Sequence, residues 1–215
     1  MKRIVLLGAR KDAHAGVLVD IIRKYHLYEI LGFFDDNEDL VGKNVLGIPV
    51  LGTIKQLPQH LPDSVDGFFI CIGDNQSRAN CYHKIKDLSG ELVNIIHPSA
   101  IISDNIQMGT GIFIGPRVII NHNSRIGDNV IINSGAIIEH DNILENHTFI
   151  GPGCNLAGRV TVQEMAFLGI GCSVIPDIII GRSTIVGAGA VVVNNLASNI
   201  TAVGVPAKKI KGGSE

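Results

Sequence analysis

A repeat of six residues runs through the second half of the chain. From His97 to Val192 the last residue of every hexad is aliphatic or Met, and no insertion breaks the phase. Two places before it the residue is usually small or β-branched, as at Ala100, Val118 and Cys154. Many hexads also begin with glycine. The opening glycines are Gly109, Gly115, Gly127, Gly151, Gly169, Gly181 and Gly187.

This period matches neither an amphipathic helix nor an alternating strand, and it predicts a parallel β-helix. Each hexad is expected to form a short strand and a turn. The aliphatic residue points into the bore, and Gly or Asn takes the turn because these residues tolerate positive φ. Three hexads close one triangular coil, so residues eighteen apart stack. The alternative, a set of unrelated aliphatic strands with glycine turns, requires the phase to hold by chance.

Residues 1–97 follow a different pattern, in which apolar runs alternate with segments of helical spacing. Strands are expected at KRIVLLG, EILGFFDD and VDGFFICIG, and helices at DAHAGVLVDIIRKY, TIKQLPQHL and NQSRANCYHKIKDL, with Asn75 near the cap of the last. A loop is expected through Asn44 and Pro49. This alternation predicts a small parallel sheet with helices on its faces. The expected organisation is therefore an α/β domain, 1–97, followed by an all-β domain, 98–215.

Composition narrows the class of protein. The 215 residues are 46% hydrophobic and carry a formal net charge of -2, so no basic excess favours nucleic acid. The apolar run at the start is too short for a signal sequence, and no long apolar span follows. We expect a cytoplasmic protein that does not enter a membrane. The four cysteines lack metal-binding spacing; Cys154 and Cys172 should stack in consecutive coils, with plain packing favoured over a disulfide.

Small parallel sheets bind ligands at the carboxyl ends of their strands. The residues expected there are Gly8, Ala9, Arg10, Lys11, Asp12, Asp35, Asp36, Gly73, Asp74 and Asn75. Arg10 stands where a second glycine of the dinucleotide fingerprint would be, which favours a nucleotide other than NAD. The alternative for Asp35 and Asp36 is a solvated turn.

The coils offer one candidate for proton transfer, the triplet Glu139–Asp141. A neutral His140 beside a carboxylate is a competent general base, because the acid holds the tautomer and stabilises the imidazolium. Eighteen residues before it lies His122, and eighteen after it lies Gly158, which leaves room for a substrate or a backbone N–H donor. The alternative is a surface histidine at a corner.

The chain leaves the hexad phase after Val192. Its segment Gly204–Lys208 predicts a rigid turn followed by basic residues, and Lys208 and Lys209 could meet a phosphate. A solvated tail is the alternative.

Eight motifs give the whole chain a resemblance to a known family. They are Gly8-Ala9, Phe34-Asp35-Asp36, Ile72-Gly73-Asp74-Asn75, Ile96-His97-Pro98-Ser99-Ala100, Ile138-Glu139-His140-Asp141, Ala157-Gly158, Leu168-Gly169-Ile170-Gly171 and Gly204-Val205-Pro206-Ala207-Lys208. In this order they resemble the two-domain hexapeptide acetyltransferases of bacterial surface-sugar pathways. That family includes the N-acetyltransferases of nucleotide-linked 4-amino sugars and the sialic acid O-acetyltransferases.

The resemblance implies a Rossmann-like nucleotide-sugar-binding domain before a left-handed β-helix, and a homotrimer with active sites between subunits. It implies that His140 is the catalytic base and that Asp141 raises its basicity. Gly8, Arg10, Lys11, Asp35, Asp36, Gly73 and Asn75 fall where the family holds the nucleotide sugar. Gly158, Ile170 and Ala188 fall along the acetyl-CoA groove, and we add Lys208 to the predicted acetyl-CoA contacts. No metal is implied.

Two departures from the family are visible. The family usually has GlyGlyHis or SerGlyHis after the first GlyAla, whereas here four residues, 10–13, precede His14, so the first loop is longer. Many relatives carry a histidine near acetyl-CoA where this chain has Phe149, and here His147 occurs nearby instead.

The resulting hypothesis is an enzyme that moves the acetyl group of acetyl-CoA to a dTDP-, UDP- or GDP-linked 4-amino-4,6-dideoxyhexose, for O-antigen, other surface polysaccharide or glycan synthesis. An O-acetyltransferase acting on a sialic acid-type sugar is the nearest alternative. A γ-type carbonic anhydrase would need His122, His140 and His147 on one zinc. A non-catalytic binding module would use the β-helix only to form a trimer.

Overall fold

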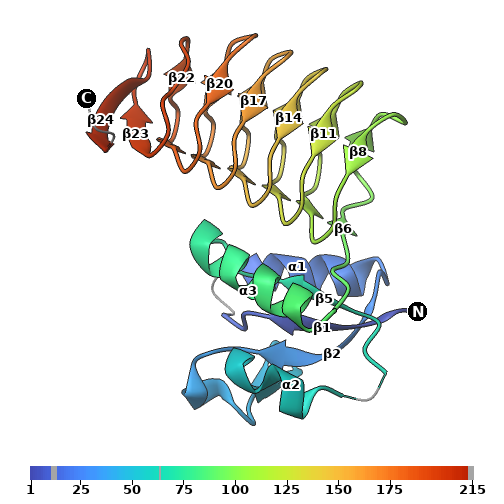
Figure 1. Cartoon of the computed structure of the whole chain (residues 1–215). Coiled ribbons are helices and arrows are strands. Elements are labelled where there is room, and N and C mark those ends of the chain that lie inside the picture. Colours follow the sequence, from blue (N-terminus) through green and yellow to red (C-terminus); the bar gives the residue numbers. More distant parts are fainter. Residues whose placement is uncertain (11–13, 63, 213–215) are drawn as a thin grey trace. The chain divides into compact units, whose positions relative to one another are not determined.

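The computed structural model describes residues 1–10, 14–62 and 64–212. The chain forms two compact units, Met1–Ile95 and Ile96–Glu215 (Figure 1). The first is an α/β unit and the second a left-handed parallel β-helix, which confirms the predicted fold class. In the described part of the chain no helix is long and apolar enough to span a bilayer.

The first unit is built on a five-stranded sheet with the order β3-β4-β2-β1-β5. Its strands are β1 (Arg3–Leu7), β2 (Glu29–Phe34), β3 (Asn44–Val45), β4 (Ile48–Gly52) and β5 (Gly67–Ile70). Its helices are α1 (His14–Lys24), α2 (Leu57–His60) and α3 (Asn75–Asp87), with single 3-10 turns η1 (Glu38–Leu40) and η2 (Ile54–Gln56). The strands β4, β2, β1 and β5 run parallel, as predicted.

The segment that was expected to be a loop through Asn44 and Pro49 is instead a hairpin. Strands β3 and β4 pair antiparallel, so the sheet is mixed rather than purely parallel. The two connecting residues, Leu46 and Gly47, have φ values of 54° and 72°. A two-residue turn with positive φ at both positions matches strand twist, but its usual first residue is Asn, Asp or Gly. Because leucine occupies this position, the turn was not predicted from the sequence.

The second unit consists of two-residue strands that stack eighteen residues apart in three sheets. For example, Ile119 lies between Ile101 and Ile137, and Phe149 lies between Ile131 and Phe167. The first sheet holds β7 (Ile101–Ile102), β10 (Ile119–Ile120), β13 (Ile137–Ile138), β16 (Asn155–Leu156), β19 (Ser173–Val174) and β22 (Val191–Val192). The second holds β8 (Gln107–Met108), β11 (Arg125–Ile126), β14 (Ile143–Leu144), β17 (Thr161–Val162) and β20 (Ile179–Ile180). The third begins with β6 (Ile95–Ile96), β9 (Phe113–Ile114), β12 (Ile131–Ile132), β15 (Phe149–Ile150), β18 (Phe167–Leu168) and β21 (Ile185–Val186).

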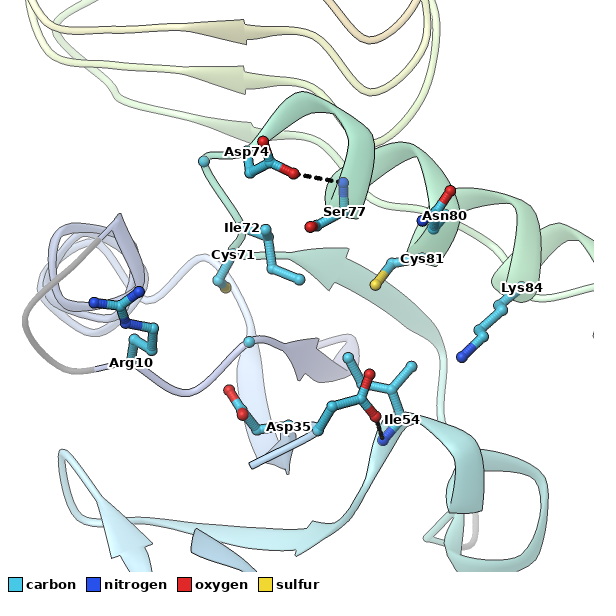
Figure 2. Close-up of a pocket in the computed structure, with 13 residues that line it drawn as sticks. Arg10, Asp35, Ile54, Cys71, Ile72, Asp74, Ser77, Asn80, Cys81 and Lys84 are labelled. Atoms are coloured by element: carbon cyan, nitrogen blue, oxygen red, sulfur yellow. Dashed lines mark hydrogen bonds between the residues drawn. The ribbon is translucent and has the colours of Figure 1, made fainter. Parts of the chain in front are cut away.

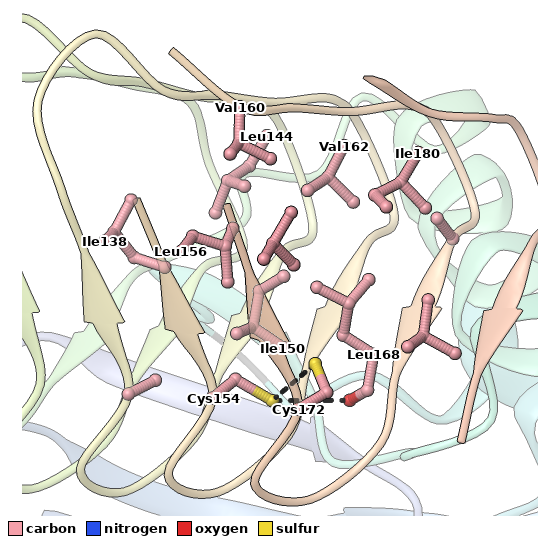
Figure 3. Close-up of a cluster of buried hydrophobic side chains, with 14 of the residues drawn as sticks. Ile138, Leu144, Ile150, Cys154, Leu156, Val160, Val162, Leu168, Cys172 and Ile180 are labelled. Carbon is pink, nitrogen blue, oxygen red and sulfur yellow. Dashed lines mark hydrogen bonds between the residues drawn. The ribbon is translucent and has the colours of Figure 1, made fainter. Parts of the chain in front are cut away.

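The last residue of each hexad fills the bore, as the periodicity predicts. Ile138, Leu156 and Leu168 are all at most 1% exposed and point inward (Figure 3). Cys154 and Cys172 also lie in the bore as free thiols, with their Sγ atoms 3.5 Å apart, which confirms plain packing over a disulfide. Each fully buried aliphatic side chain contributes about 1.5–3 kcal/mol, so stability accumulates coil by coil.

The prediction that Gly or Asn takes the turn with positive φ is confirmed in part, for example at Asn123 and Gly135, with φ values of 60° and 69°. Other residue types also adopt this backbone. The left-handed backbone falls at the third residue of the hexad, where Asp141, His147 and Met165 have φ values of 60°, 61° and 63°.

The glycine at the first position of many hexads is required for another reason. A Cβ atom on Gly151 would lie 2.6 Å from the backbone oxygen of Leu168 in the next coil. The close approach of stacked backbones, and not positive φ, therefore excludes a side chain there.

The predicted turn is present at residues 204–207, but the basic residues after it form a strand and not a solvated tail. Strand β23 (Ile200–Val203) continues the third sheet, and β24 (Lys208–Gly212) pairs with it antiparallel at the sheet edge. Lys208 and Lys209 are therefore strand residues, and both are exposed. Lysines on an edge strand discourage pairing with another chain.

Candidate active site

The α/β unit contains a cavity of about 640 Å³ at the carboxyl ends of β1, β2 and β5 (Figure 2). It is lined by Gly8, Arg10, Asp35, Asp36, Ile54, Cys71, Ile72, Gly73, Asp74, Ser77, Asn80, Cys81 and Lys84. Five of the residues expected to hold the nucleotide sugar therefore face one space: Gly8, Arg10, Asp35, Asp36 and Gly73. Lys11 lies outside the described residues.

Gly8 is where the backbone turns away from β1 into the cavity rim. Its φ is 97°, and a Cβ atom here would lie 2.8 Å from Cγ1 of Ile72. The N–H of Gly8 donates to the carbonyl oxygen of Phe34 at 2.8 Å, which ties this turn to the end of β2. Only glycine satisfies both the backbone angle and the close approach.

Asp35 and Asp36 hold backbone around the cavity, so neither is only a solvated turn residue. One carboxylate oxygen of Asp35 accepts the N–H of Ala9 at 2.6 Å, and the other accepts the N–H of Asn37 at 2.8 Å. Asp36 accepts the N–H of Ile54 at 3.1 Å. Asp35 thus fixes the loop that carries Arg10, and Asp36 fixes the start of η2.

Asn75 does not line the cavity. Its side-chain oxygen accepts Nη2 of Arg78 at 2.8 Å, and Nη1 of Arg78 donates to the carbonyl oxygens of Gly73 and Ile72 at 2.9 and 3.3 Å. Arg78 is fully buried, and burial lowers its pKa to about 10, so it stays protonated at neutral pH. This cation supports the loop beneath the cavity, and the sequence reasoning missed it.

Asp74 was expected at this edge of the sheet, but the face that α3 turns to the cavity was missed. Asp74 caps the helix by accepting the N–H of Ser77 at 2.8 Å, a hydrogen bond that lowers the pKa of Asp74. Ser77, Asn80, Cys81 and Lys84 follow along one face. Figure 2 shows Lys84 and Arg10 at opposite sides of the cavity. The three- and four-residue spacing of this polar stripe was the available signal.

In the β-helix, His140 and Asp141 occupy the turn between β13 and β14. Nδ1 of His140 lies 2.7 Å from a carboxylate oxygen of Asp141. A carboxylate only accepts, so Nδ1 carries the proton and Nε2 keeps its lone pair. The hydrogen bond from Asn123, and then the bond from His140, lower the pKa of Asp141. The imidazole is 47% exposed, so a reactant can reach the ring.

Gly158 lies directly against the imidazole. A Cβ atom here would be 2.6 Å from both Cε1 and Nε2 of His140. The absent side chain therefore first makes room for the histidine ring itself, beyond the room for substrate that the sequence suggested. Any larger residue would push the ring out of its place beside Asp141.

The other β-helix candidates lie elsewhere. His147 is at the corner between the second and third sheets, is 3% exposed, and has Nδ1 2.8 Å from the amide nitrogen of Asn129. His122 lies at the corner of His140, with Nε2 3.4 Å from the amide nitrogen of Asn105. Within the described ranges no group of three or more His, Cys, Asp or Glu is placed to hold a metal ion.

Ile170 and Ala188 occupy a third corner, between the third and first sheets, eighteen residues apart. Ile170 is 60% exposed. Lys208 lies on edge strand β24 of the third sheet. Within one chain, these predicted acetyl-CoA contacts are therefore separated from His140 and Gly158 by the width of a sheet.

Together these features can perform two tasks. The cavity offers a cation at either side, a glycine turn and carboxylates, a set of groups suited to a phosphorylated nucleoside. The His140–Asp141 pair can remove a proton from a nucleophile without a metal or a covalent intermediate.

Known proteins share this architecture over the full length. Perosamine N-acetyltransferase from Caulobacter crescentus, solved as a histidine variant in complex with CoA and GDP-perosamine, is 40% identical, with 99% of this chain and 98% of that chain covered and a TM-score of 0.91. The acetyltransferase domain of PglB from Neisseria gonorrhoeae, in complex with acetyl coenzyme A, is 28% identical, with coverages of 97% and 99% and a TM-score of 0.89. WeeI from Acinetobacter baumannii, at 22% identity, coverages of 98% and 100% and a TM-score of 0.87, shares the fold.

A family model described as the PglD N-terminal domain matches residues 3–85. A search of the curated proteins found no match. The identity to the C. crescentus enzyme extends over both units, so the likeness is not confined to the repeat. This chain belongs to the family of two-domain, hexapeptide-repeat sugar acetyltransferases.

Proposed function

We propose that this protein is an acetyl-CoA-dependent N-acetyltransferase that acts on the 4-amino group of a nucleotide-linked 4-amino-4,6-dideoxyhexose. The observation that carries the proposal is the His140–Asp141 pair, 2.7 Å apart, on the fold of a 40% identical enzyme solved with CoA and GDP-perosamine. Two of the C. crescentus structures are of variants in which one histidine is replaced, by asparagine or by alanine. A histidine is thus a natural candidate for the base here.

The reaction follows from the groups at the corner. The neutral amine attacks the thioester carbonyl carbon, a C–N bond forms, and the C–S bond then breaks to release CoA. Nε2 of His140 takes the proton that the amine loses, and Asp141 stabilises the imidazolium that results. The proton returns to the departing thiolate, so amine and thioester give amide and thiol. Proximity supplies much of the acceleration, because a bound amine beside a thioester is already reactive.

The first unit, 1–97 in the sequence-based division, is assigned to the nucleotide sugar. In this proposal Arg10 binds the diphosphate at the Gly8 turn, and Asp35 and Gly73 shape the loops on either side. Support comes from the shared cavity and from the 2.6 Å bond between Asp35 and Ala9. Asn75 is assigned an indirect role, in which it binds Arg78 and does not contact the nucleotide sugar.

Among the three nucleotides that the sequence leaves open, we favour guanosine diphosphate. A second hollow of about 330 Å³ shares Ile54 and Lys84 with the main cavity and is also lined by Leu57, Pro58 and Leu88. This adjoining space suits a two-ring base with an apolar face against Ile54. The Lys84 ammonium can donate to O6 and N7 of guanine, the edge that lysine and arginine read in nucleic acids.

The second unit, 98–215, is assigned to acetyl-CoA and the chemistry, in a homotrimer. Gly158 and His140 lie at one corner of the coil, whereas Ile170 and Ala188 lie at another. A site that contains all four residues forms if the corner of one chain faces a different corner of its neighbour. Ile143 and Ile179, 38% and 45% exposed on the outer face of the second sheet, are suited to burial between chains. Light scattering on the purified protein gives the oligomeric state.

The proposed product, an N-acetylated nucleotide sugar, is a donor for surface polysaccharide, O-antigen or other glycan synthesis. We place the enzyme in the cytoplasm, where acetyl-CoA is available.

The test is thiol release from acetyl-CoA with GDP-, UDP- and dTDP-linked 4-amino-4,6-dideoxyhexoses and with sialic acid. The matched control is the GDP-linked 6-deoxyhexose with a 4-hydroxyl in place of the amine. We expect turnover with the GDP-linked amino sugar and none with its hydroxyl counterpart. Turnover on sialic acid alone would overturn the proposal in favour of O-acetylation.

A further inference from the structure

A column of polar residues runs along the corner that carries His140. Asn123, Asp141, Arg159 and Asp177 are the third residues of hexads eighteen apart, and their φ values are 60°, 60°, 60° and 65°. Because the backbone is the same in each coil, their side chains leave the corner in the same direction and stack. Asn and Asp are common in this left-handed conformation, so the turns alone would account for three of the four residues.

The contacts within the column go beyond what turns need. The amide nitrogen of Asn123 donates to one oxygen of Asp141 at 2.6 Å, while the other oxygen faces Nδ1 of His140 at 2.7 Å. Both carboxylate oxygens of Asp141 are thus engaged. The backbone N–H of Asn123 in turn donates to the side-chain oxygen of Asn105 at 3.2 Å, which anchors Asn123 to the coil before it.

On the other side of Asp141 stands Arg159. It is the adjacent member of the column. The hydrogen bond to Asp177 and the charge of Asp177 raise the pKa of Arg159, and the charge of Asp141 adds to this rise. Its guanidinium nevertheless binds Asp177, with Nε–Oδ1 at 2.5 Å and Nη2–Oδ2 at 2.8 Å. A bidentate pair of this kind holds the planar group in one orientation. Arg159 is thereby directed away from the carboxylate that serves His140.

We propose that Asn123 and Asp177 are positioning residues for the general base, an inference that rests on the proposed role of His140. Asn123 orients Asp141 toward Nδ1 of the imidazole. Asp177 holds Arg159 so that the cation does not compete with His140 for Asp141. The imidazole therefore keeps both its tautomer and the full effect of the neighbouring negative charge.

Two substitutions should move the pH dependence of kcat in opposite directions. The titratable groups around Asp141 in this unit are His140, His122 and Arg159, with Glu139 beside His140 and Asp177 beyond Arg159. Asn123→Asp adds a negative charge next to Asp141, which favours the imidazolium. Asp177→Asn frees Arg159 to pair with Asp141, which disfavours the imidazolium. One charge at this range corresponds to a shift of about half a pH unit.

The experiment measures kcat against pH for the wild-type enzyme and three variants. We expect Asn123→Asp to move the acidic limb of the kcat profile to higher pH, and Asp177→Asn to move it to lower pH, each by about half a pH unit. Asn123→Gly keeps the left-handed backbone and removes the donor, and should lower kcat about tenfold, the value of one charge-assisted hydrogen bond. Ser183→Gly, at a third position of another corner with φ 53°, is the matched control and should change neither quantity.

An NMR pH titration of the His140 ring separates this inference from the proposed function. Its signal is identified by its loss in His140→Ala, and its midpoint should move in the same opposite directions whether or not the protein turns over a given sugar. Absence of acetyl transfer with shifted midpoints would reject the proposed function alone. Midpoints that match the Ser183→Gly control in both variants would overturn the positioning roles.

Discussion

The two units present their functional side chains on different kinds of framework. In the α/β unit each loop of the cavity is held by its own contact, such as the bond from Ala9 to Asp35 or the bond from Arg78 to Gly73. In the β-helix every coil has the same framework. A residue with a special role can therefore be recognised because it or its neighbour differs from the residues at the same position in other coils. His140 has Gly158 directly against its ring, and no repeat requires that pair. In the proposed function, one unit serves recognition, and the other repeats a scaffold and places the chemistry at one corner.

The largest effect should come from removing the base. His140→Ala deletes the proton acceptor, so kcat should fall by about 10² to 10⁴-fold. The KM for the nucleotide sugar should change little, because in the proposed function the nucleotide binds on the other unit. Steady-state kinetics with the amino sugar measures both values. His60→Ala, an exposed histidine of the α/β unit, is the control. A loss of only a few-fold in a folded variant would contradict the assignment.

The next largest effect is on stability. It is measured with the same substitution, glycine to alanine, at one position in each unit. Gly151→Ala places a methyl group 2.6 Å from a backbone oxygen of the adjacent coil, which cannot move alone. We expect a loss of about 1–3 kcal/mol in the free energy of unfolding, in the range of overpacked cores. Gly73→Ala meets no atom within 4 Å and should stay within about 0.5 kcal/mol of wild type. Denaturant titration compares them; equal losses would show that stacked coils tolerate the extra group.

These two glycines also show what can and cannot be predicted from the sequence. The unbroken phase from His97 to Val192 predicts the coils, and the apolar runs predict β1, β2 and β5. The reason for the glycines that open the hexads was not predicted, because close backbone approach cannot be distinguished from positive φ in a sequence. The carboxyl ends of the strands predicted the place of the cavity and six of its lining residues, Asp74 included.

The remaining site residues needed coordinates for identifiable reasons. Arg78 is a charged residue in a helix, and nothing in its neighbours indicates that it is fully buried beneath Gly73. The hairpin at Leu46 and Gly47 lacks the usual turn residue. The left hand of the coil opposes the general preference of parallel crossovers, so the residues implied it only through resemblance.

A smaller effect should separate recognition from chemistry in the α/β unit. Both oxygens of Asp35 accept backbone N–H groups, so in Asp35→Asn one donor would face the new amide nitrogen instead of an acceptor. The loop that carries Arg10 should loosen, and the KM for the nucleotide sugar should rise about tenfold with kcat retained. Asp39→Asn, an exposed neighbour, is the control. A fall in kcat at unchanged KM would assign Asp35 to the chemistry.

The smallest effect is a pH dependence of stability in the α/β unit. Burial, and then the positive charge of Arg78, lower the pKa of His14 to about 4. Between about pH 6.5 and 4 the unfolded chain binds a proton that the folded chain does not, so stability should fall as the pH decreases. The slope is at most about 1.4 kcal/mol per pH unit. Denaturant titrations at pH 7, 6 and 5 should show a smaller slope in His14→Gln but not in His60→Gln. Equal slopes in all three proteins would contradict the burial of His14.

The division of labour itself is tested most directly by calorimetric titration of the GDP-linked amino sugar into His140→Ala and Arg10→Ala, alongside their turnover numbers. The account predicts that His140→Ala binds the nucleotide sugar as wild type does and scarcely turns over. Arg10→Ala should bind it at least about tenfold more weakly, from the lost charge-assisted contact, and turn over at the wild-type rate when saturated. The reverse pattern, with binding lost in His140→Ala and kept in Arg10→Ala, would contradict the assignment of recognition to the α/β unit and of proton transfer to the β-helix.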